Sequence, residues 1–327
     1  MMKNNFDAPL VVVFGGAGYI GSVLTRLLLK DGYRVRVFDN FLFGDHGIQH
    51  IASHEGLEIM RGDLGDTCSV SSACRNADAV ILLAAIVGRR GVDIRHPIMR
   101  DINFLSSSVV LDAAIEHGAS RFIFASTDSV YGIQSGLMYE TATPEPVTLY
   151  SRLKLRMEER VINARTRGFH PTALRIATCH GFSPRMRFDL AANGMIRDAV
   201  CKRVITVIGG EQWRPMVHVD DVARAFMACM LAHENLVSGE VFNVGSNEQN
   251  VQIREVAKLV HKLVPEAEVN FVEDAPDLVD YRLSCSKIEK ILDFKPQWTL
   301  EASITQTKEM LENGDFGEPY RLKYQNT

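Results

Sequence analysis

The stretch Leu10–Asn40, LVVVFGGAGYIGSVLTRLLLKDGYRVRVFDN, decides the fold. Its continuous apolar run, Leu10–Phe14, is typical of a strand that is buried on both faces. Apolar residues at helical spacing follow the glycines and predict a helix that extends to about Lys30. A second strand is expected over Arg34–Phe38. Strand, glycine turn, helix and strand together indicate a βαβ unit, and therefore a parallel sheet covered by helices.

The glycines of this stretch, Gly15, Gly18 and Gly21, follow a G-x-x-G-x-x-G spacing. One glycine permits the tight turn, one lets the backbone approach a pyrophosphate, and one lets the helix pack closely on the strand. The helix that begins here points its unpaired N–H groups and the positive end of its dipole at bound phosphates. The turn therefore predicts a phosphate-binding site.

An acidic residue, Asp39, ends the second strand, eighteen residues after Gly21. A carboxylate at this place can accept hydrogen bonds from both ribose hydroxyls of a dinucleotide and repels a 2′-phosphate. A glycine cluster alone is often only a loop. Combined with the strands, the helix and the acid, it favours NAD as the bound coenzyme over NADP.

Composition limits the kind of protein. The chain has 327 residues, of which 46% are hydrophobic, enough for one large core or for two lobes that share a cleft. Its net charge is −4 with mixed signs, which argues against a nucleic-acid partner. The apolar run near the start is too short for a signal peptide or a membrane span, and no later run reaches the roughly 18 residues needed. We expect no membrane partner and a cytoplasmic location.

Six cysteines are scattered along the chain without C-x-x-C spacing. This pattern favours reduced cytosolic thiols over a disulfide framework or a zinc site. They are Cys68, Cys74, Cys179, Cys201, Cys229 and Cys285.

Strands alternate with helices along the first half of the chain, which predicts an α/β fold with a doubly wound parallel (Rossmann) sheet and a smaller α/β substrate-binding lobe. Further strands are expected over Leu57–Arg61, Asp78–Leu83, Arg121–Ser126 and Thr172–Ile176, with long helices over Asp101–His117 and Tyr150–Arg167. In the second half, helices are expected over Asp189–Cys201, Val222–Leu231, Ile253–Val264 and Ser286–Leu292, with strands over Val204–Ile208 and Val269–Val272. We assign 1–177 and 213–246 to the NAD-binding domain, and 178–212 and 247–327 to a discontinuous substrate lobe.

Two strand ends carry residues suited to a flat ligand. Asp63 follows the strand Leu57–Arg61 and would lie over the sheet crevice, where an adenine amino group could meet it. The alternative, a helix N-cap before the segment from Asp66, is equally compatible with the local sequence. Ala84 and Ala85 follow the strand Asp78–Leu83; such small residues permit close contact with a ligand or simply good packing.

The chemistry is expected where the strand Arg121–Ser126 ends. Thr127 lies at this end, and the next helix begins with Tyr150 and Lys154, which share a face because they are four residues apart. A lysine ammonium beside a phenol favours the phenolate, and a cationic nicotinamide lowers the phenol pKa further. Such a tyrosine can serve as the base for an alcohol or sugar hydroxyl.

At this point the chain resembles the extended short-chain dehydrogenase/reductases of the NAD-dependent epimerase/dehydratase family, which act on nucleotide-activated sugars. The resemblance spans nearly the whole chain. Its motifs are GGAGYIG at 15–21, Asp39-Asn40, Gly62-Asp63-Leu64, Leu83-Ala84-Ala85, STDSVYG at 126–132, Y-x-x-x-K at 150–154, QWRPMVHVDD at 212–221 and FNVG at 242–245.

The resemblance implies a role for individual residues. It implies Tyr150 as the base, Lys154 as the residue that orients Tyr150 and the nicotinamide ribose, Thr127 as the catalytic hydroxyl, and Asn103 as a brace of the active site. The residues expected to contact NAD are Gly15, Gly18, Tyr19, Ile20, Gly21, Asp39, Asn40, Asp63, Leu64, Ala84, Ala85, Asn103, Tyr150 and Lys154.

Three positions depart from the family pattern. Phe14 replaces a common threonine, and Thr178 stands where many relatives carry an asparagine, at a possible substrate or nicotinamide contact. Sugar 4,6-dehydratases resemble this chain but have Thr-Asp-Glu at 127–129. The family's aspartate protonates the departing hydroxyl, so Asp128 is a further catalytic candidate. Ser129 replaces the glutamate that removes a proton, and a serine is a poor base near neutral pH. The missing base makes a dehydratase activity a less favoured interpretation.

The substrate side is expected in the second half of the chain. Guanidinium groups suit phosphate oxygens, and the resemblance places Arg214 and Arg282 on the diphosphate of a nucleotide sugar. Arg187 or Arg185 would bind a carboxylate or another group of the sugar. The expected substrate contacts are Ser129, Thr178, Arg187, Asn193, Arg214 and Arg282.

Two histidine-containing stretches admit other functions. Cys179 and His180 could form an extra acid–base pair near the sugar, although a buried thiol and a structural histidine are the more ordinary interpretation. His218 with Asp220 and Asp221 suggests a metal site. We expect no metal, because no third ligand has suitable spacing and either aspartate makes an ordinary helix cap.

These residues favour a nucleotide-sugar epimerase that oxidises C4 transiently to a 4-keto intermediate with bound NAD. The alternatives are a 4,6-dehydratase or a 4-keto reductase of the same family. A non-catalytic NAD-binding protein is the alternative from another class, because a fold alone never proves chemistry. The helices over Asp101–His117 and Tyr150–Arg167 are those that relatives pair across a dimer interface, which implies a homodimer.

Overall fold

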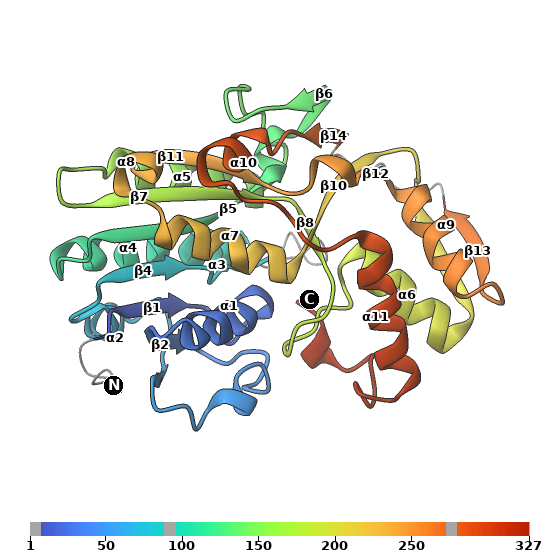
Figure 1. Ribbon diagram of the computed structural model, residues 1–327, viewed down its shortest axis with the longest axis horizontal. Coiled ribbons are helices and arrows are strands. Elements are labelled where there is room, and N and C mark those ends of the chain that lie inside the picture. Colours follow the sequence, from blue (N-terminus) through green and yellow to red (C-terminus); the bar gives the residue numbers. More distant parts are fainter. Residues whose placement is uncertain (1–7, 88–95, 273–279, 327) are drawn as a thin grey trace.

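A seven-stranded parallel sheet forms the centre of the protein. The structure, a computed structural model, describes residues 8–87, 96–272 and 280–326. Neighbouring strands of the main sheet follow the order β11-β7-β5-β4-β1-β2-β3 (Figure 1). They are β1 (Leu10–Phe14), β2 (Arg34–Asp39), β3 (Leu57–Arg61), β4 (Ala79–Leu82), β5 (Arg121–Thr127), β7 (His170–Ile176) and β11 (Glu240–Val244). This confirms the predicted doubly wound sheet.

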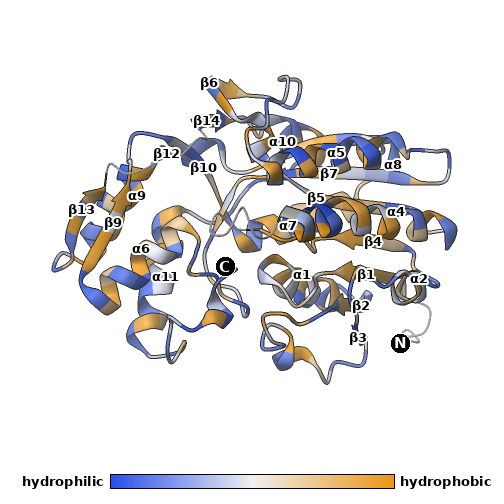
Figure 2. Cartoon of the chain, turned by 180° about the vertical axis from the view of Figure 1, so that it is seen from behind, coloured by the Kyte–Doolittle hydropathy of each residue, from blue (hydrophilic) through white to orange (hydrophobic). Residues whose placement is uncertain are grey.

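Helices cover both faces of the sheet. Successive side chains of a strand point to opposite faces, so Val11 and Val13 enter one hydrophobic core, while Val12 and Phe14 enter the other. The first core includes α1 (Tyr19–Lys30) and α7 (Val219–Leu231); the second includes α2 (Thr67–Cys74), α4 (Ser107–Glu116) and α5 (Leu149–Asn163). The central strands are accordingly coloured as hydrophobic in Figure 2.

The chain order reverses at β1. From this strand the chain proceeds outward to β2 and β3, and the next strand, β4, lies on the other side of β1. Ligands of open α/β sheets bind at such a reversal, outside the carboxyl ends of the strands. The glycine turn after β1 lies at this point, so the fold presents it to a ligand.

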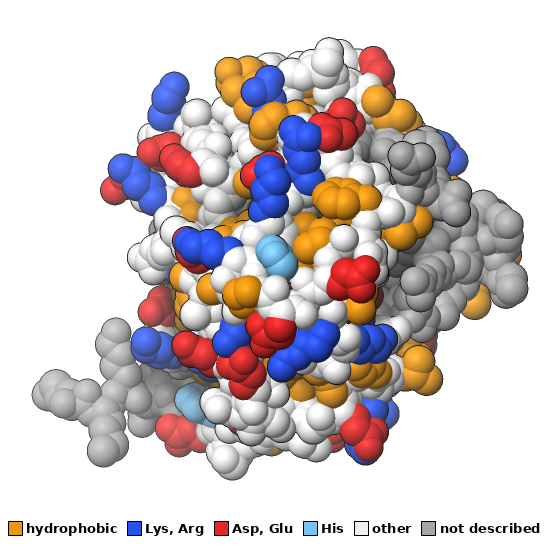
Figure 3. All heavy atoms as spheres, turned by 90° about the vertical axis from the view of Figure 1, so that its right-hand side faces the viewer, with side chains coloured by type: hydrophobic (Ala, Val, Ile, Leu, Met, Phe, Trp, Pro, Cys, Tyr) orange, Lys and Arg blue, Asp and Glu red, His pale blue; other side chains and the backbone are white. Residues whose placement is uncertain are grey.

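A smaller lobe lies beside the main sheet, on the right in Figure 1. Its core joins residues such as Ile196, Ile205, Val256 and Ile304. Its elements are α6 (Ala191–Lys202), α9 (Ile253–Leu263), α11 (Leu300–Glu312) and the parallel pair β9 (Val204–Ile208) and β13 (Glu268–Val272). On the face shown in Figure 3, acidic and basic side chains are interspersed.

Short strands connect the two parts. One three-stranded sheet joins β8 (Thr178–His180), β10 (Trp213–His218) and β12 (Asn250–Gln252), and a parallel pair joins β6 (Ile133–Met138) to β14 (Asp280–Leu283). Strand β11 of the main sheet follows α6 and β9 of the smaller lobe in the sequence and precedes its α9, β13 and α11. The chain therefore crosses between the two parts more than once. The domain boundaries given above stay a prediction.

Several elements differ from the sequence-based expectation. The helix expected over Asp101–His117 is divided into a π-helix, η3 (Asp101–Ser106), and α4, and the one expected over Tyr150–Arg167 ends at Asn163. Strands β6, β8, β10, β11, β12 and β14 and helix α11 were not expected. The remaining short elements are α3 (His96–Arg100), α8 (Glu234–Val237), α10 (Ser286–Leu292), η2 (Gln49–Ile51), η4 (Asp128–Tyr131), η5 (Asn247–Gln249) and η6 (Leu322–Tyr324).

The start of α7 corrects one prediction. Its N-cap is His218, whose Nδ1 accepts a hydrogen bond from the backbone N–H of Asp220 at 3.1 Å, so neither aspartate caps the helix. Asp221 instead accepts hydrogen bonds from the backbone N–H groups of Gln297 and Trp298. Within the described ranges, no helix is long and apolar enough to cross a membrane.

Candidate active site

The glycine turn has the geometry that a pyrophosphate needs. Gly15 adopts φ +84°, and a Cβ there would lie 2.7 Å from the backbone nitrogen of Ala84, so only glycine fits. A Cβ on Gly21 would collide with the carbonyl oxygen of Gly15. Helix α1 begins directly after Gly18, and no side chain caps this end. Its first amides therefore suit a dinucleotide pyrophosphate.

The side chain of Tyr19 holds this turn against the smaller lobe. Its hydroxyl donates to the carbonyl of Gly181 at 2.6 Å and accepts from Nδ2 of Asn193 at 3.3 Å. The Asn193 side chain also accepts from the backbone N–H of Gly181 and donates to the carbonyl of Arg187. Because the Tyr19 side chain is engaged within the protein, a contact of Tyr19 with NAD would come from the helix backbone. The substrate contact of Asn193 stays a prediction.

The acid at the end of β2 also shapes the turn. The Asp39 carboxylate accepts hydrogen bonds from the backbone N–H groups of Ala17 at 3.1 Å and Phe41 at 2.9 Å, and burial raises its pKa. Next to it, Asn40 donates to Asp63 at 3.3 Å. The cap of α2 is Asp66, not Asp63. Asp63 also accepts a hydrogen bond from the backbone N–H of Gly65 at 2.8 Å, and its adenine contact stays a prediction.

The loop after β4 completes the crevice. The backbone N–H of Ala84 donates to the carbonyl of Phe14, which seats this loop directly beside the glycine turn. Asn103 braces it, since its amide exchanges two hydrogen bonds with the backbone of Ile86, at 2.8 and 2.9 Å. Asn103 lies in the π-helix, an element often found at functional sites. The predicted coenzyme residues thus meet at the carboxyl edge of the sheet and fit NAD.

Tyr150 and Thr127 meet at the same edge, whereas Lys154 reaches β5 two residues before Thr127. The ammonium of Lys154 donates to the carbonyl of Ala125 at 2.6 Å, and burial lowers the pKa of Lys154 to about 7. Burial raises the pKa of Tyr150 to about 12, while Arg187 and a hydrogen bond with Thr127 act in the opposite direction. The phenol and the threonine hydroxyl can therefore meet one substrate oxygen. Their catalytic role stays a prediction.

Asp128 and Ser129 flank this centre. The hydroxyls of Thr127 and Ser129 lie 2.9 Å apart, and Thr127 also approaches the Asp128 carboxyl at 3.5 Å. Burial raises the pKa of Asp128 to about 7, against the lowering effects of Tyr281 and Arg214. A carboxyl with this pKa can donate or accept a proton near neutrality.

The arginines expected on the substrate side fall into two groups. Arg214 on β10 and Arg282 on β14 both contact Trp213: Arg214 donates to its carbonyl at 2.7 Å, and the Arg282 guanidinium lies 5.3 Å from its ring centroid. Arg187 makes a two-bond ion pair with Asp189 and lies close enough to Tyr150 and Cys179 for its charge to oppose the rise in pKa that burial causes in both.

Arg185 occupies a different place. It is fully buried, with its guanidinium 4.2 Å from the ring centroid of Phe43 and one hydrogen bond to the carbonyl of Gln325. Its charge lowers the pKa of Asp39. Arg185 thus lies toward the expected ribose site, not toward Tyr150.

Cys179 and His180 do not act as a pair. Cys179 lies near Tyr150, and burial raises the pKa of its thiol to about 12. His180 is fully buried, bonds Ser303 at 2.8 Å and lies 5.5 Å from the ring of His218. Successive side chains of β8 point to opposite sides, which separates the two. In the part of the chain that the structure describes, no three His, Cys, Asp or Glu side chains gather as metal ligands.

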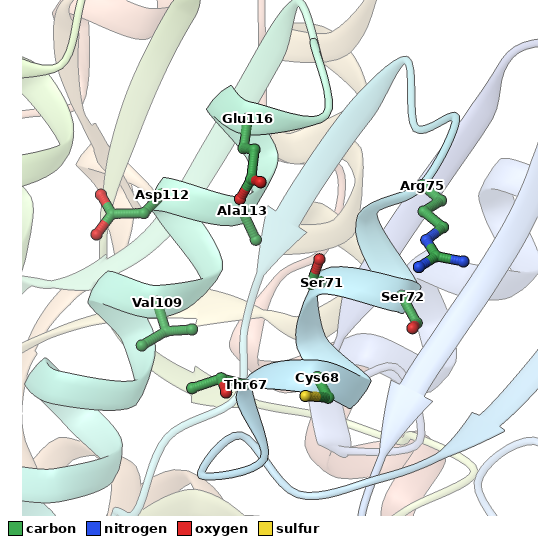
Figure 4. Close-up of a pocket in the computed structure, with 9 residues that line it drawn as sticks. All are labelled: Thr67, Cys68, Ser71, Ser72, Arg75, Val109, Asp112, Ala113 and Glu116. Atoms are coloured by element: carbon green, nitrogen blue, oxygen red, sulfur yellow. The ribbon is translucent and has the colours of Figure 1, made fainter.

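Two residues at this site were missed from the sequence. Glu158 lies four residues after Lys154, on the same face of α5, and pairs with Arg175; this helical spacing was a usable signal. Tyr281 on β14 adjoins Asp128, but nothing local in the sequence indicates it. A separate surface hollow between α2 and α4 (Figure 4) contains none of the predicted site residues.

Comparison with known proteins agrees with this geometry. The pattern of a family described as the NAD dependent epimerase/dehydratase family matches residues 11–245. The chain is 27% identical over 307 residues to "Uncharacterized UDP-glucose epimerase YtcB" of Bacillus subtilis, covering 90% of this chain and 95% of that protein. It is 28% identical over 314 residues to a UDP-N-acetyl-alpha-D-glucosaminuronate decarboxylase of Bacillus cytotoxicus, covering 90% and 95%.

Solved structures resemble the whole chain. UDP-glucuronic acid 4-epimerase from Bacillus cereus, in complex with UDP-glucuronic acid and NAD, has a TM-score of 0.84 at 27% identity. MoeE5 in complex with UDP-glucuronic acid and NAD has a TM-score of 0.82 at 26% identity. Each comparison covers 93% of this chain and 99% of the other.

Proposed function

Because the chain belongs to the NAD dependent epimerase/dehydratase family, we propose that it is a nucleotide-sugar epimerase that oxidises and re-reduces C4 of its substrate. The observation that carries this proposal is the contact of Tyr150 with Thr127 at the carboxyl edge of the sheet, the edge that also carries the glycine turn. Relatives of similar length include proteins named as UDP-glucose and UDP-glucuronic acid epimerases. A uridine diphosphate sugar is therefore the substrate class to test first.

The chain's own residues would move the proton and hold the sugar. The Tyr150 phenolate would accept the proton of the C4 hydroxyl, with Thr127 hydrogen-bonded to the same oxygen. Lys154, when charged, would favour the phenolate. Bound NAD supplies the acceptor and later the donor of the C4 hydride. Asp39 and the first turn of α1 would hold it, while Arg214 and Arg282 would hold the diphosphate and leave the sugar free to turn.

A 4,6-dehydratase is the second candidate, and Asp128 is the observation that favours it. Its buried carboxyl, with a pKa of about 7, could protonate a departing C6 hydroxyl. Dehydration also needs a base at C5, and Ser129 lacks a carboxylate. Ser129 instead lies within hydrogen-bond distance of Thr127. Epimerisation is therefore favoured, with a 4-keto reductase as a further alternative.

Product analysis tests the proposal. The protein with NAD is incubated with UDP-glucose, UDP-glucuronic acid and the GDP-, CDP- and dTDP-sugars. The products are separated by chromatography, and their molecular masses are measured by mass spectrometry. A stereoisomer of equal mass supports the epimerase. Loss of water supports the dehydratase, and consumption of added NADH supports the reductase. Binding of NAD without turnover of any sugar, or turnover that survives Tyr150→Phe, would favour the non-catalytic alternative or another base.

A homodimer and a cytoplasmic location complete the proposal. Large apolar side chains are exposed beside α4 and α5: Ile98 and Leu105 precede α4, and Ile115 lies within it. Together with the resemblance to relatives that pair these helices, the exposed apolar side chains favour a second copy of the chain here. All six cysteines are free, which favours a reducing compartment. Sedimentation at micromolar concentration tests the dimer, and a monomer would contradict it.

A further inference from the structure

A row of buried polar side chains crosses the sheet beneath α5. Ser126 of β5, Arg175 of β7 and Asn243 of β11 are direct neighbours in register. All three are buried. Polar groups in a core must be hydrogen-bonded, and a complete network fixes geometry more strictly than apolar packing does. Ser126 of this row directly precedes Thr127 in β5.

Glu158 connects this row to the helix that carries the predicted base. Tyr150, Lys154 and Glu158 follow at intervals of four, so they share one face of α5. The Glu158 carboxylate accepts hydrogen bonds from Ser126 at 2.6 Å and from two nitrogens of Arg175, at 2.7 and 3.1 Å. Both charged side chains are almost fully buried. The pair therefore clamps α5 to β5 and β7.

The same row extends to β14 on the substrate side. Arg175 donates to the Tyr131 hydroxyl at 2.9 Å, and this hydroxyl donates to Oδ1 of Asn243 at 2.7 Å. Nδ2 of Asn243 donates to the carbonyl of Ser284 at 3.0 Å. Ser284 directly follows β14, which carries Arg282 and Tyr281. Each hydrogen bond of this connection lies in the interior, where water does not compete for it.

Stability alone does not explain such a network, because a buried ion pair can be exchanged for apolar residues at little loss. Its value lies in the geometry that it imposes. We propose that Glu158, Arg175, Tyr131 and Asn243 are positioning residues that hold α5 in register with β14, so that a nucleotide bound at Arg282 sets the position of Tyr150. Both consequences rest on the proposed nucleotide site at Arg282, and only the kinetic one also requires the proposed sugar chemistry.

The structural consequence is tested with UDP as the probe. Amide hydrogen exchange is measured in the full chain with NAD, with and without UDP, in the wild type and in Tyr131→Phe. Tyr324→Phe is the matched control, because its buried hydroxyl donates to the carbonyl of Phe316, outside the network. UDP should slow amide exchange over residues 149–163 in the wild type and in the control. In Tyr131→Phe, the factor by which UDP slows this exchange should be at least tenfold smaller. Equal protection in all three proteins, or none in the wild type, would overturn the proposal.

The kinetic consequence is measured on the same variants. Tyr131→Phe should lower kcat about tenfold with KM for the nucleotide sugar nearly unchanged, because Arg282 still binds but the reacting atoms lose alignment. Glu158→Gln keeps an acceptor for Ser126 and should act in the same direction. An unchanged kcat in both folded variants would overturn the proposal. If the wild type turns over no sugar while the exchange pattern holds, the proposed function fails and the positioning network stands.

Discussion

Glu158 and Arg160 lie two residues apart on α5, and each forms an ion pair with a neighbouring element in a different environment. Glu158 faces inward and binds Arg175, with side-chain exposures of 4% and 6%. Arg160 faces outward and binds Asp112 of α4 at 2.8 Å, with exposures of 42% and 60%. The inner face also carries Tyr150 and Lys154. Helix α5 thus has a buried face, which carries the predicted catalytic residues and the Glu158–Arg175 pair, and an opposite face that is exposed to solvent.

The contrast teaches that similar distances do not imply similar importance. The inner pair cannot lose one member without leaving a buried charge, whereas water replaces either member of the outer pair. We therefore expect substitutions on the inner face to affect activity or folding strongly and those on the outer face to affect neither.

The largest effect is expected at the inner face from Tyr150→Phe. It removes only the hydroxyl that would accept the substrate proton, so kcat should fall about 10³-fold while folding is unaffected. Rates of sugar conversion and thermal melting measure the two quantities. A loss of less than tenfold in a well-folded variant would place the base elsewhere.

The second effect concerns the buried ion pair itself. Glu158→Ala leaves the Arg175 charge without its partner and should destabilise the fold by about 3–5 kcal/mol. Urea unfolding followed by circular dichroism measures this free energy. The double substitution of Glu158 and Arg175 by apolar residues should recover most of the stability but not the activity. A single-variant loss below 1 kcal/mol would contradict the comparison.

A stabilising effect is expected from Lys154→Met. Because burial lowers the pKa of Lys154 to about 7, the unfolded chain binds its proton more readily than the folded chain between pH 7 and 10. Wild-type stability should therefore rise with pH across this range. Met removes a penalty of up to about 5 kcal/mol but removes the hydrogen bond to the carbonyl of Ala125, for a net gain of about 2–4 kcal/mol.

This gain should be largest at or below pH 7 and shrink toward pH 10, while sugar conversion is lost. Unfolding midpoints at pH 6.5 and 9.5 measure it. Lys262→Met, at an exposed lysine, serves as the control. A destabilised Lys154→Met at pH 6.5 would show that the hydrogen bond from the ammonium to Ala125 outweighs the cost of burying the charge.

The smallest effect is expected on the outer face. Arg160→Ala should change the free energy of unfolding by less than about 1 kcal/mol and leave the rate of conversion unaltered. The urea midpoint of unfolding, measured at several protein concentrations, provides the check. A larger loss that depends on protein concentration would indicate that the Arg160–Asp112 pair belongs to a subunit contact.

Local signals predicted the first part of the fold closely. Strand β1 has the expected bounds and helix α1 ends at Lys30 as expected, although it begins at Tyr19, within the glycine turn; the geometry of both depends on neighbours in sequence. Strand β10 was missed since it contains Pro215 and gains its partners from distant segments. Helix α11 did have a signal, the Thr299 cap, which was overlooked.

The candidate site shows the same division. The spacing of Tyr150 and Lys154 could be found in the sequence, as could Thr127 at a strand end. The burial of Asp128 beside Tyr281 could not, because Tyr281 comes from a strand far along the chain. The opposite orientations of Cys179 and His180 depend on the pairing of β8 with β10, another nonlocal feature.

The position of β11 has a consequence for biosynthesis. This edge strand of the main sheet is translated only after most of α6, β9 and β10, so β7 leaves the ribosome with an unpaired edge. Until residues 240–244 emerge, the nascent chain presents a hydrogen-bonding template to other polypeptides. We expect fragments that stop at residue 177 to aggregate or to recruit chaperones, even though their glycine turn is complete.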